Sequence, residues 1–255
     1  MDIGRALTFF TEDERWVEKT AIGTAVILIS MLLSVILVGL VGFFIVLGYG
    51  VRLMRNVRDD VQPVLPEWDQ WGDDLVRGFK LMVVGLVWTL PVWLLMVPVF
   101  VGSAMAEAGQ AAQFLGTLLF LCGACLLFLY SLFVAFLAPG YTIAFAERER
   151  IGDGLAVGAI WSWSVAHLGQ VVVAVLAVLI ASFVVSFVGL LVGLLLCLIG
   201  LVVTVPLSTL VTTYIQFHLY GQLARTGPVV GSAPGEPPQA GPGEDSGWEP
   251  VVSTS

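Results

Sequence analysis

The chain has few charged residues, and they are unevenly distributed. Asp, Glu, Lys and Arg make up 12% of its 255 residues, whereas apolar residues make up 58%. None of the four occurs between Asp153 and Arg225. Soluble domains contain about 25% charged residues, and a membrane-spanning helix needs about 20 mostly apolar residues. The sequence therefore predicts a polytopic membrane protein and excludes an ordinary soluble domain.

Basic residues and cysteines are scarce as well. The chain has 11 Lys and Arg against 19 Asp and Glu, which gives a net charge of -8. It offers no basic stripe that could neutralise phosphates, so we expect no nucleic-acid partner. Its three cysteines, Cys122, Cys125 and Cys197, lie inside apolar segments. We interpret them as free thiols packed among helices, not as a disulfide framework, a redox pair or a zinc site.

Signatures of catalysis are missing too. The sequence has no Gly-rich phosphate loop, no G-x-S-x-G and no H-E-x-x-H. The predicted spans contain no carboxylate, and His218 is the only ionisable side chain deep in a late span. Such a residue is a functional candidate because its burial is costly, although a hydrogen bond between helices is the more ordinary interpretation. We expect no enzymatic activity and no cofactor.

A metal site is the next alternative. Four acids, Glu67, Asp69, Asp73 and Asp74, could gather a divalent cation. Acids at the start of a helix and on its hydrated face explain the same residues through the helix dipole. We therefore predict no metal ion.

The apolar segments and the positions of Lys and Arg predict the topology. Residues 21–51 are long for one span, and a hairpin turning around Gly39 to Gly42 makes two spans of them. Residues 81–105 and 114–138 form one span each, and residues 171–222 form two. With six spans, every Lys and Arg falls on one side of the membrane, as the positive-inside rule requires. A single pass through residues 21–51 is the five-span alternative.

The predicted fold is thus an all-α, polytopic transmembrane helical bundle of residues 21–225, with two interfacial amphipathic connector helices. Residues 1–20 form an amphipathic segment, with Ile3, Leu7 and Phe10 on one face. Thr11 to Glu14 matches a capping box, so the first span should begin near Glu12. Residues 226–255 form a Pro/Gly-rich acidic tail that we expect to be disordered. We place both termini in the cytoplasm and the protein in the plasma membrane of a bacterium or archaeon.

The connectors between spans carry the candidate site residues. A short helix from Pro66, and a second one within residues 141–170, place tryptophans at headgroup level as interfacial anchors. These anchors are Trp68, Trp71, Trp161 and Trp163. Basic residues at the end of the first hairpin set its orientation and are candidates for contact with anionic lipid headgroups. They are Arg52, Arg55 and Arg58.

Small residues and prolines mark the spans themselves. Gly189 and Gly193 form a G-x-x-x-G, which lets helices approach closely. We interpret the motif as helix packing, either within one protomer or between two. Pro91, Pro98 and Pro206 should bend their helices because each removes a backbone donor.

Several of these stretches resemble a known family. They are Gly48-Tyr49-Gly50, the Arg52/Arg55-Asn56 turn, Leu65-Pro66, Trp71-Gly72-Asp73, Gly78-Phe79-Lys80, Pro139-Gly140 and the closing YIQFHLYGQLAR. The sequence is similar to domain-of-unknown-function family 4013, a group of bacterial and archaeal polytopic membrane proteins. The resemblance covers most of residues 1–225. It implies a helical membrane bundle, and it implies no activity, substrate or cofactor.

Two functions are compatible with these features. The first is a non-enzymatic scaffold or accessory subunit, whose partners are membrane lipids and a membrane protein or a second copy of the chain. The second is a permease or lipid-handling protein, because proline-kinked helices can line a pathway. The second function predicts a cavity between the kinks.

Overall fold

The computed structural model describes residues 2–36, 38–105, 109–196 and 200–230, and within these ranges the chain is helical without β-strands. Six of the helices are long and apolar enough to cross a membrane. They are α2 (Trp16–Leu33), α3 (Leu40–Arg58), α4 (Trp71–Ala104), α5 (Gln110–Arg148), α8 (Leu168–Leu195) and α9 (Leu201–Ala224). The predictions of an all-α fold and of six spans are confirmed.

Residues 21–51 form a hairpin and not a single span. The helices α2 and α3 are separated by the short 3-10 turn η2 (Ser34–Ile36) and by Gly39. The Gly39 N–H donates a hydrogen bond to the carbonyl of Leu33. A Cβ at Gly39 would lie 2.7 Å from the Leu33 carbonyl carbon, so only glycine fits the turn. The first apolar run therefore supplies two of the six helices.

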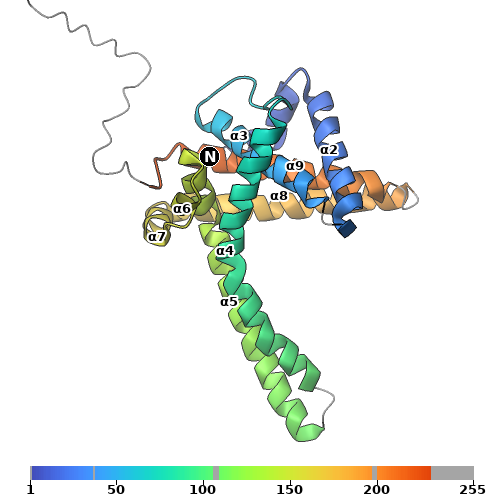
Figure 1. Cartoon of the computed structure of the whole chain (residues 1–255), viewed down its shortest axis with the longest axis vertical. Helices are drawn as coiled ribbons and strands as arrows, with labels where there is room; N and C mark the ends of the chain where they lie inside the picture. Colours follow the sequence, from blue (N-terminus) through green and yellow to red (C-terminus); the bar gives the residue numbers. More distant parts are fainter. Residues whose placement is uncertain (1, 37, 106–108, 197–199, 231–255) are drawn as a thin grey trace, which may run out of the picture.

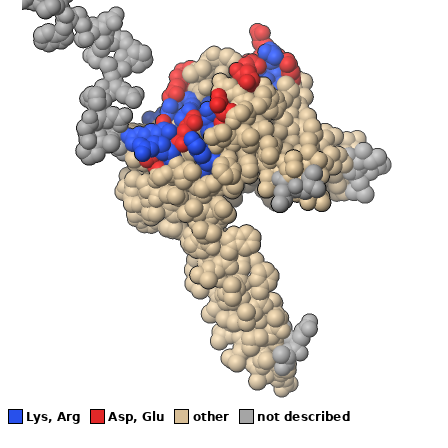
Figure 2. Space-filling model, in the orientation of Figure 1, with Lys and Arg blue, Asp and Glu red and all other residues tan. Residues whose placement is uncertain are grey.

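The six helices pair as three hairpins, α2–α3, α4–α5 and α8–α9, whose open ends meet at one end of the molecule (Figure 1). Lys and Arg gather at this common end, and the visible faces of the two long hairpins carry none (Figure 2). We call this end the hub. The α4–α5 arm and the α8–α9 arm leave it in different directions (Figure 1). This arrangement matches the one-sided distribution of basic residues in the sequence.

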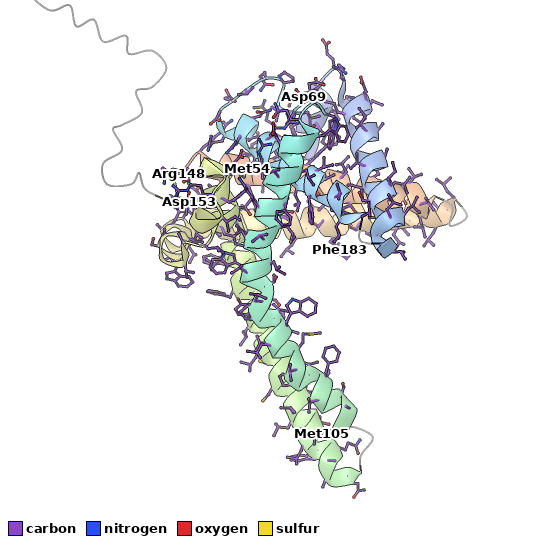
Figure 3. All side chains as sticks on the ribbon, viewed as in Figure 1. Met54, Asp69, Met105, Arg148, Asp153 and Phe183 are labelled. Carbon is purple, nitrogen blue, oxygen red and sulfur yellow. The ribbon has the colours of Figure 1, made fainter. Side chains whose placement is uncertain are left out.

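The α4–α5 arm reaches farthest from the hub, with Met105 at its tip (Figure 3). Its helices have 34 and 39 residues, or roughly 50 and 58 Å at 1.5 Å per residue. Glycines allow them to pack closely. A Cβ at Gly102 would lie 2.6 Å from the carbonyl oxygen of Gly116, and one at Gly123 would lie 3.0 Å from Val99. The arm is therefore a tightly closed pair of helices.

The start of the chain differs from the prediction. It forms α1 (Ile3–Thr8) and the 3-10 helix η1 (Phe9–Glu12), and α2 begins at Trp16, not near Glu12. The predicted capping box is absent because the Thr11 hydroxyl donates to the carbonyl of Thr8 instead. Ala6 and Phe9 are buried.

The first connector also differs from the prediction. Residues 61–70 form no helix, and Trp71 begins α4, which continues without a break to Ala104. Three successive carbonyls of the connector are held by side chains from α2 and α3, which prevents a helix. Tyr49 Oη donates to Pro66 at 2.8 Å, Lys19 Nζ to Leu65 at 2.9 Å, and Arg52 Nη2 to Glu67 at 2.6 Å.

The second connector does contain a separate short helix. It forms α6 (Ile151–Gly154) and α7 (Val157–Ala166), and α8 follows after a single residue. A helix is thus present in the second connector, as predicted, and its interfacial position stays a prediction. The first predicted connector helix does not form separately, because residues 66–70 are not helical and its part from Trp71 onward is the start of α4.

The cysteines and the tail complete the comparison with the sequence. Cys122 and Cys125 are free thiols but lie exposed on α5, so the expected packing among helices is wrong. Cys197 lies outside the described residues, as does the predicted tail from residue 231 onward. The last described residues pack on the helices, since Val229 is buried and its N–H donates to Glu147 Oε1 at 2.7 Å.

Candidate functional site

Six charged side chains of alternating sign form a continuous chain of ion pairs in the hub. We call this the ion-pair chain: Asp69, Arg52, Asp74, Arg77, Glu149 and Arg55. Arg52 binds Asp69 at 2.9 Å and Asp74 at 2.8 Å, and Arg77 binds Asp74 at 2.6 Å. Glu149 Oε1 then accepts from Arg77 at 2.7 Å and from Arg55 at 2.5 Å. The ion-pair chain links the first connector, α3, α4 and the end of α5.

Burial makes the balance of these charges important. The side chain of Asp74 is 1% exposed, those of Arg77 and Arg52 are 10% and 12% exposed, and Asp74 bridges the two guanidiniums. A buried charge is tolerated only when partners replace its hydration. Three cations and three anions alternate, so the ion-pair chain is neutral as a whole.

Close approach of α3 and α4 brings the partners together. A Cβ at Gly48 would lie 2.6 Å from backbone atoms of Asp74, and one at Gly78 would lie 2.7 Å from the carbonyl carbon of Phe44. The two helices therefore approach backbone to backbone at Asp74 and again one turn later at Gly78. Arg52 and Arg55 lie one turn apart on α3, as Asp74 and Arg77 do on α4, so each helix presents its pair on one face.

Glu149 ends α5 in a left-handed conformation, with φ 54°. Burial raises the pKa of its carboxyl, but the hydrogen bond from Arg77 and the charges of Arg55 and Arg77 outweigh burial, so the pKa lies below its ordinary value. The pKa of Asp69 is lowered in the same way by the hydrogen bond from Arg52. Both carboxyls are therefore charged at neutral pH.

A second cluster fixes the first connector to α2. The ring of Trp68 stacks on that of Tyr49 at 4.0 Å between centroids, and its Nε1 donates to the carbonyl of Lys19. Lys19 is fully buried and binds Asp13 at 2.7 Å and Glu67 at 2.9 Å. Tertiary contacts thus hold this connector in place.

A polar cavity lies at the N-terminal side of the hub, and we call it the N-terminal cavity. Its volume is about 250 Å³. Its lining comes from the chain start, the end of α3, the connector and the end of α9: Asp2, Arg5, Asn56, Val57, Asp60, Gln62, Val64, His218, Gln222 and Arg225. His218 is buried there and stacks on Phe9, with ring centroids 4.1 Å apart.

The basic residues predicted to contact lipid headgroups have protein partners. Arg52 lies in the ion-pair chain, Arg55 also donates to the carbonyl of Ala146, and Arg58 binds Asp59 at 2.7 Å. Contact with headgroups stays a prediction, and of the three Arg58 has the most exposed side chain.

The predicted aromatic anchors divide into two kinds. Trp71 and Trp161 are exposed, as anchors in a headgroup layer should be. Trp68 lies against Tyr49, and Trp163 is buried with its Nε1 directed to the carbonyl of Gly227.

The predicted G-x-x-x-G lies between α8 and α9. A Cβ at Gly189 would collide with Ser208 Oγ, and one at Gly193 would lie 2.6 Å from Thr204 Oγ1. Both glycines therefore face α9 within the same chain.

Three of the four connector acids have cationic partners. Glu67, Asp69 and Asp74 bind cationic side chains, and Asp73 is exposed. Within the described ranges, no group of three or more His, Cys, Asp or Glu side chains has the arrangement of a metal site.

Sequence reasoning missed the roles of Asp74, Arg77 and Glu149. The pair at 74 and 77 has the i, i+3 spacing of an intrahelical ion pair, which was an available signal. Glu149 lies 72 residues from Arg77, and only the fold joins them.

A profile of the family described as "Protein of unknown function (DUF4013)" matches residues 31–194, which is more than half of the chain. The chain belongs to the DUF4013 family. The resemblance inferred from the sequence is therefore confirmed, and every member of the ion-pair chain lies inside the part that is typical of DUF4013. The closing stretch of α9 lies beyond the matched residues. Neither the curated proteins nor the solved structures contain a match.

Proposed function

We propose that this DUF4013 protein is a non-enzymatic scaffold or accessory subunit that binds a partner helix within the membrane through the outer face of α5. The single observation that supports the proposal most is a row of apolar side chains along the α4–α5 arm. All are exposed and lie on the face of α5 turned away from α4. They are Phe114, Leu118, Leu121, Cys125, Phe128 and Leu132.

The spacing within this row, which we call the α5 seam, suits a partner helix. Its members alternate at intervals of four and three residues, which is the repeat by which two helices interlock side chains along their length. The opposite face of α5 is already occupied, because Gly116 and Gly123 pack against α4. A second helix along the α5 seam would complete a three-helix layer.

The hub favours a role as scaffold or accessory subunit because it fixes the base of the α4–α5 arm. The ion-pair chain ties α5 to α3 and α4 through Glu149, and the carbonyl of Ala146 accepts from Arg55. A rigid base presents the α5 seam in one orientation, which lowers the entropy lost on association. We propose that the hub and both termini face the cytoplasm of a bacterial or archaeal cell, because the basic residues gather there.

The test is purification of the full chain from its own membrane in a mild detergent, followed by native mass spectrometry. We expect a second polypeptide, or a second copy, in stoichiometric amount. Leu121→Trp in the α5 seam should abolish the complex because the indole keeps the partner helix at a distance. Leu126→Trp is the matched control, since Leu126 is also exposed on α5 but lies outside the α5 seam.

Two results would contradict the proposal. One is a complex that survives Leu121→Trp unchanged. The other is a saturable, substrate-dependent flux in liposomes that contain this chain alone, because a scaffold requires none.

A permease or lipid-handling protein is the second candidate, and a groove between α3, α4, α5 and α9 favours it. The groove is mostly apolar and holds a few polar side chains, Thr89, Thr142 and Gln216. Thr89 lies two residues before Pro91, where α4 lacks one backbone donor. If this candidate is correct, Thr89→Leu should reduce the liposome flux, whereas Thr117→Leu on the distant part of α5 should not.

A further inference from the structure

We propose that the N-terminal cavity and an adjacent apolar groove on α8 together bind one phospholipid whose headgroup carries a phosphate and a primary ammonium group. The site does not depend on the proposed partner-binding role, because its residues lie on α1, α8, α9, the end of α3 and the first connector, whereas the α5 seam lies on the α4–α5 arm. Three observations support it: a histidine hydrogen-bond donor in the cavity lining, a balanced set of charges, and the apolar groove.

The donor is Nε2 of His218, a residue of the cavity lining. The backbone N–H of Asp2 donates to Gln222 Oε1 at 2.7 Å, which fixes the orientation of the Gln222 amide. Gln222 Nε2 then donates to the carbonyl of Asp2 at 2.9 Å and lies 3.2 Å from His218 Nδ1. Because an amide nitrogen has only donors, Nδ1 must accept, and the neutral imidazole carries its proton on Nε2. That Nε2–H has no hydrogen-bond partner among the described residues.

The charges around this donor are balanced. Arg5 and Arg225 bring two guanidiniums to the cavity, and Asp2 and Asp60 bring two carboxylates. Each cation has one acidic partner, Glu12 for Arg5 and Asp60 for Arg225, at 3.3 and 3.1 Å, and both arginine side chains remain about half exposed. Guanidiniums and an N–H bind a phosphate through charge-assisted hydrogen bonds. The carboxylates match a primary ammonium, so a zwitterionic headgroup satisfies both signs.

The apolar groove lies on the other flank of α1, and we call it the α8 groove. Ile3 and Leu7 of α1 form one wall, and Val173, Ala177, Ile180 and Val184 line α8. Its lining is entirely apolar and follows a membrane-spanning helix. Asp2 and Arg5 face the N-terminal cavity while Ile3 and Leu7 face the α8 groove. α1 has six residues, or about 9 Å of helix, so the two sites lie on opposite flanks of one short helix and within the span of one phospholipid.

The charge balance and the groove together identify the ligand as a lipid with a phosphoethanolamine-type headgroup. A free phosphoethanolamine would satisfy the cavity but leave the groove empty. An anionic lipid would add net negative charge to a lining in which two carboxylates already match the two guanidiniums. These alternatives differ in affinity, which allows one titration to separate them.

The experiment titrates the purified full chain with short-chain (dihexanoyl) phosphatidylethanolamine and measures bound lipid by native mass spectrometry. Dihexanoyl phosphatidylglycerol, dihexanoyl phosphatidylcholine and free phosphoethanolamine are titrated in parallel. We expect the dissociation constant of phosphatidylethanolamine to be about tenfold lower than that of each of the three, because each lacks one contact.

Two substitutions with matched controls locate the site. Arg5→Gln should weaken phosphatidylethanolamine binding about tenfold, whereas Arg15→Gln, at another exposed arginine of the hub, should not. Val173→Trp fills the α8 groove and should weaken binding to the same degree. Val172→Trp is its control, since Val172 and Val173 are 39% and 44% exposed and only Val173 lines the groove. Equal helical circular-dichroism signals show that each variant is folded.

The proposal is overturned if Arg5→Gln and Val173→Trp, both folded, leave the dissociation constant of phosphatidylethanolamine unchanged. If phosphatidylglycerol binds as tightly as phosphatidylethanolamine, the assignment of a zwitterionic headgroup is overturned. If free phosphoethanolamine binds as tightly as the lipid, the α8 groove has no role in binding and the ligand is a soluble compound. Loss of the partner complex in Leu121→Trp, with lipid binding intact, distinguishes this site from the proposed function.

Discussion

Asp74 is the residue on which the charge balance of the hub depends. Its carboxylate lies between Arg52 and Arg77 at 2.8 and 2.6 Å and is almost completely removed from solvent. Replacing an entire buried ion pair by apolar residues can be harmless, but removing one partner leaves an uncompensated charge. Removing the Asp74 carboxylate would leave the guanidiniums of Arg52 and Arg77 close together without their shared counter-charge.

We expect Asp74→Asn to destabilise the protein by about 3–5 kcal/mol, because the amide cannot neutralise either arginine. The measurement is the thermal unfolding midpoint in detergent micelles. Asp73→Asn is the control, since Asp73 is the neighbouring, exposed acid, and it should change the midpoint little. Equal midpoints for the two variants would contradict the role assigned to the ion-pair chain.

Glu149 gives the hub a pH dependence. Its folded pKa lies below the ordinary value through Arg77 and Arg55, despite burial. A carboxyl with a lowered folded pKa stabilises the fold above its unfolded pKa, and this stabilisation is lost as pH falls through the folded pKa. The contribution is therefore complete at neutral pH and decreases below about pH 5.

Glu149→Gln should lower the unfolding midpoint at neutral pH. As pH falls, the midpoint of the variant should decrease less than that of the wild type. The wild type and the variant are compared in the same detergent from about pH 7 to about pH 4. The difference between their midpoints should shrink as pH falls. A difference that is the same at both ends of the range would show that Glu149 acts through packing and not through charge.

At the scale of elements, glycine contacts decide which helices touch. Gly102 and Gly116 join α4 to α5, while Gly48 and Gly78 join α3 to α4. Gly85 also lies on α4, but a Cβ there would meet nothing within 4 Å. On α4, Gly102 is thus required for close packing and Gly85 is not, and the sequence around them does not distinguish the two.

Gly102→Ala should destabilise the α4–α5 arm by roughly 1–3 kcal/mol, because the added methyl group would overlap the backbone of Gly116 and Phe120. Gly85→Ala is the matched control and should leave stability unchanged or raise it by up to about 1 kcal/mol through helix propensity. Both are measured by thermal unfolding in micelles. A Gly102→Ala variant as stable as Gly85→Ala would mean that the two helices do not approach so closely.

At the scale of the whole molecule, the topology places the open ends of three hairpins on one side. Single cysteines at Glu12, Asp73, Gln110, Gly152 and Ser232, in a chain without Cys122, Cys125 and Cys197, test this arrangement. A membrane-impermeant thiol reagent added outside intact cells should label only the cysteine at Gln110. Labelling after permeabilisation is the control. Outside labelling at Glu12 would contradict the α2–α3 hairpin.

Sequence alone determined the membrane class, the number of helices long enough to span and the gathering of basic residues at one end. These properties follow from local composition, because about 20 apolar residues suffice for a span and basic residues resist translocation. The resemblance at Gly48-Tyr49-Gly50 and Gly78-Phe79-Lys80 likewise depends on residues that are close in the chain. The second connector helix was predicted for the same reason.

Only the tertiary structure decided the partners of the charged and polar side chains. Arg55 and Glu149 are 94 residues apart, and Asp2 and Gln222 are 220 apart, so no local pattern relates them. The first connector forms no separate helix because the side chains of Lys19, Tyr49 and Arg52 donate hydrogen bonds to its carbonyls. Spans follow from transfer free energies summed along the chain, whereas a hub follows from contacts that exist only after the hairpins have packed.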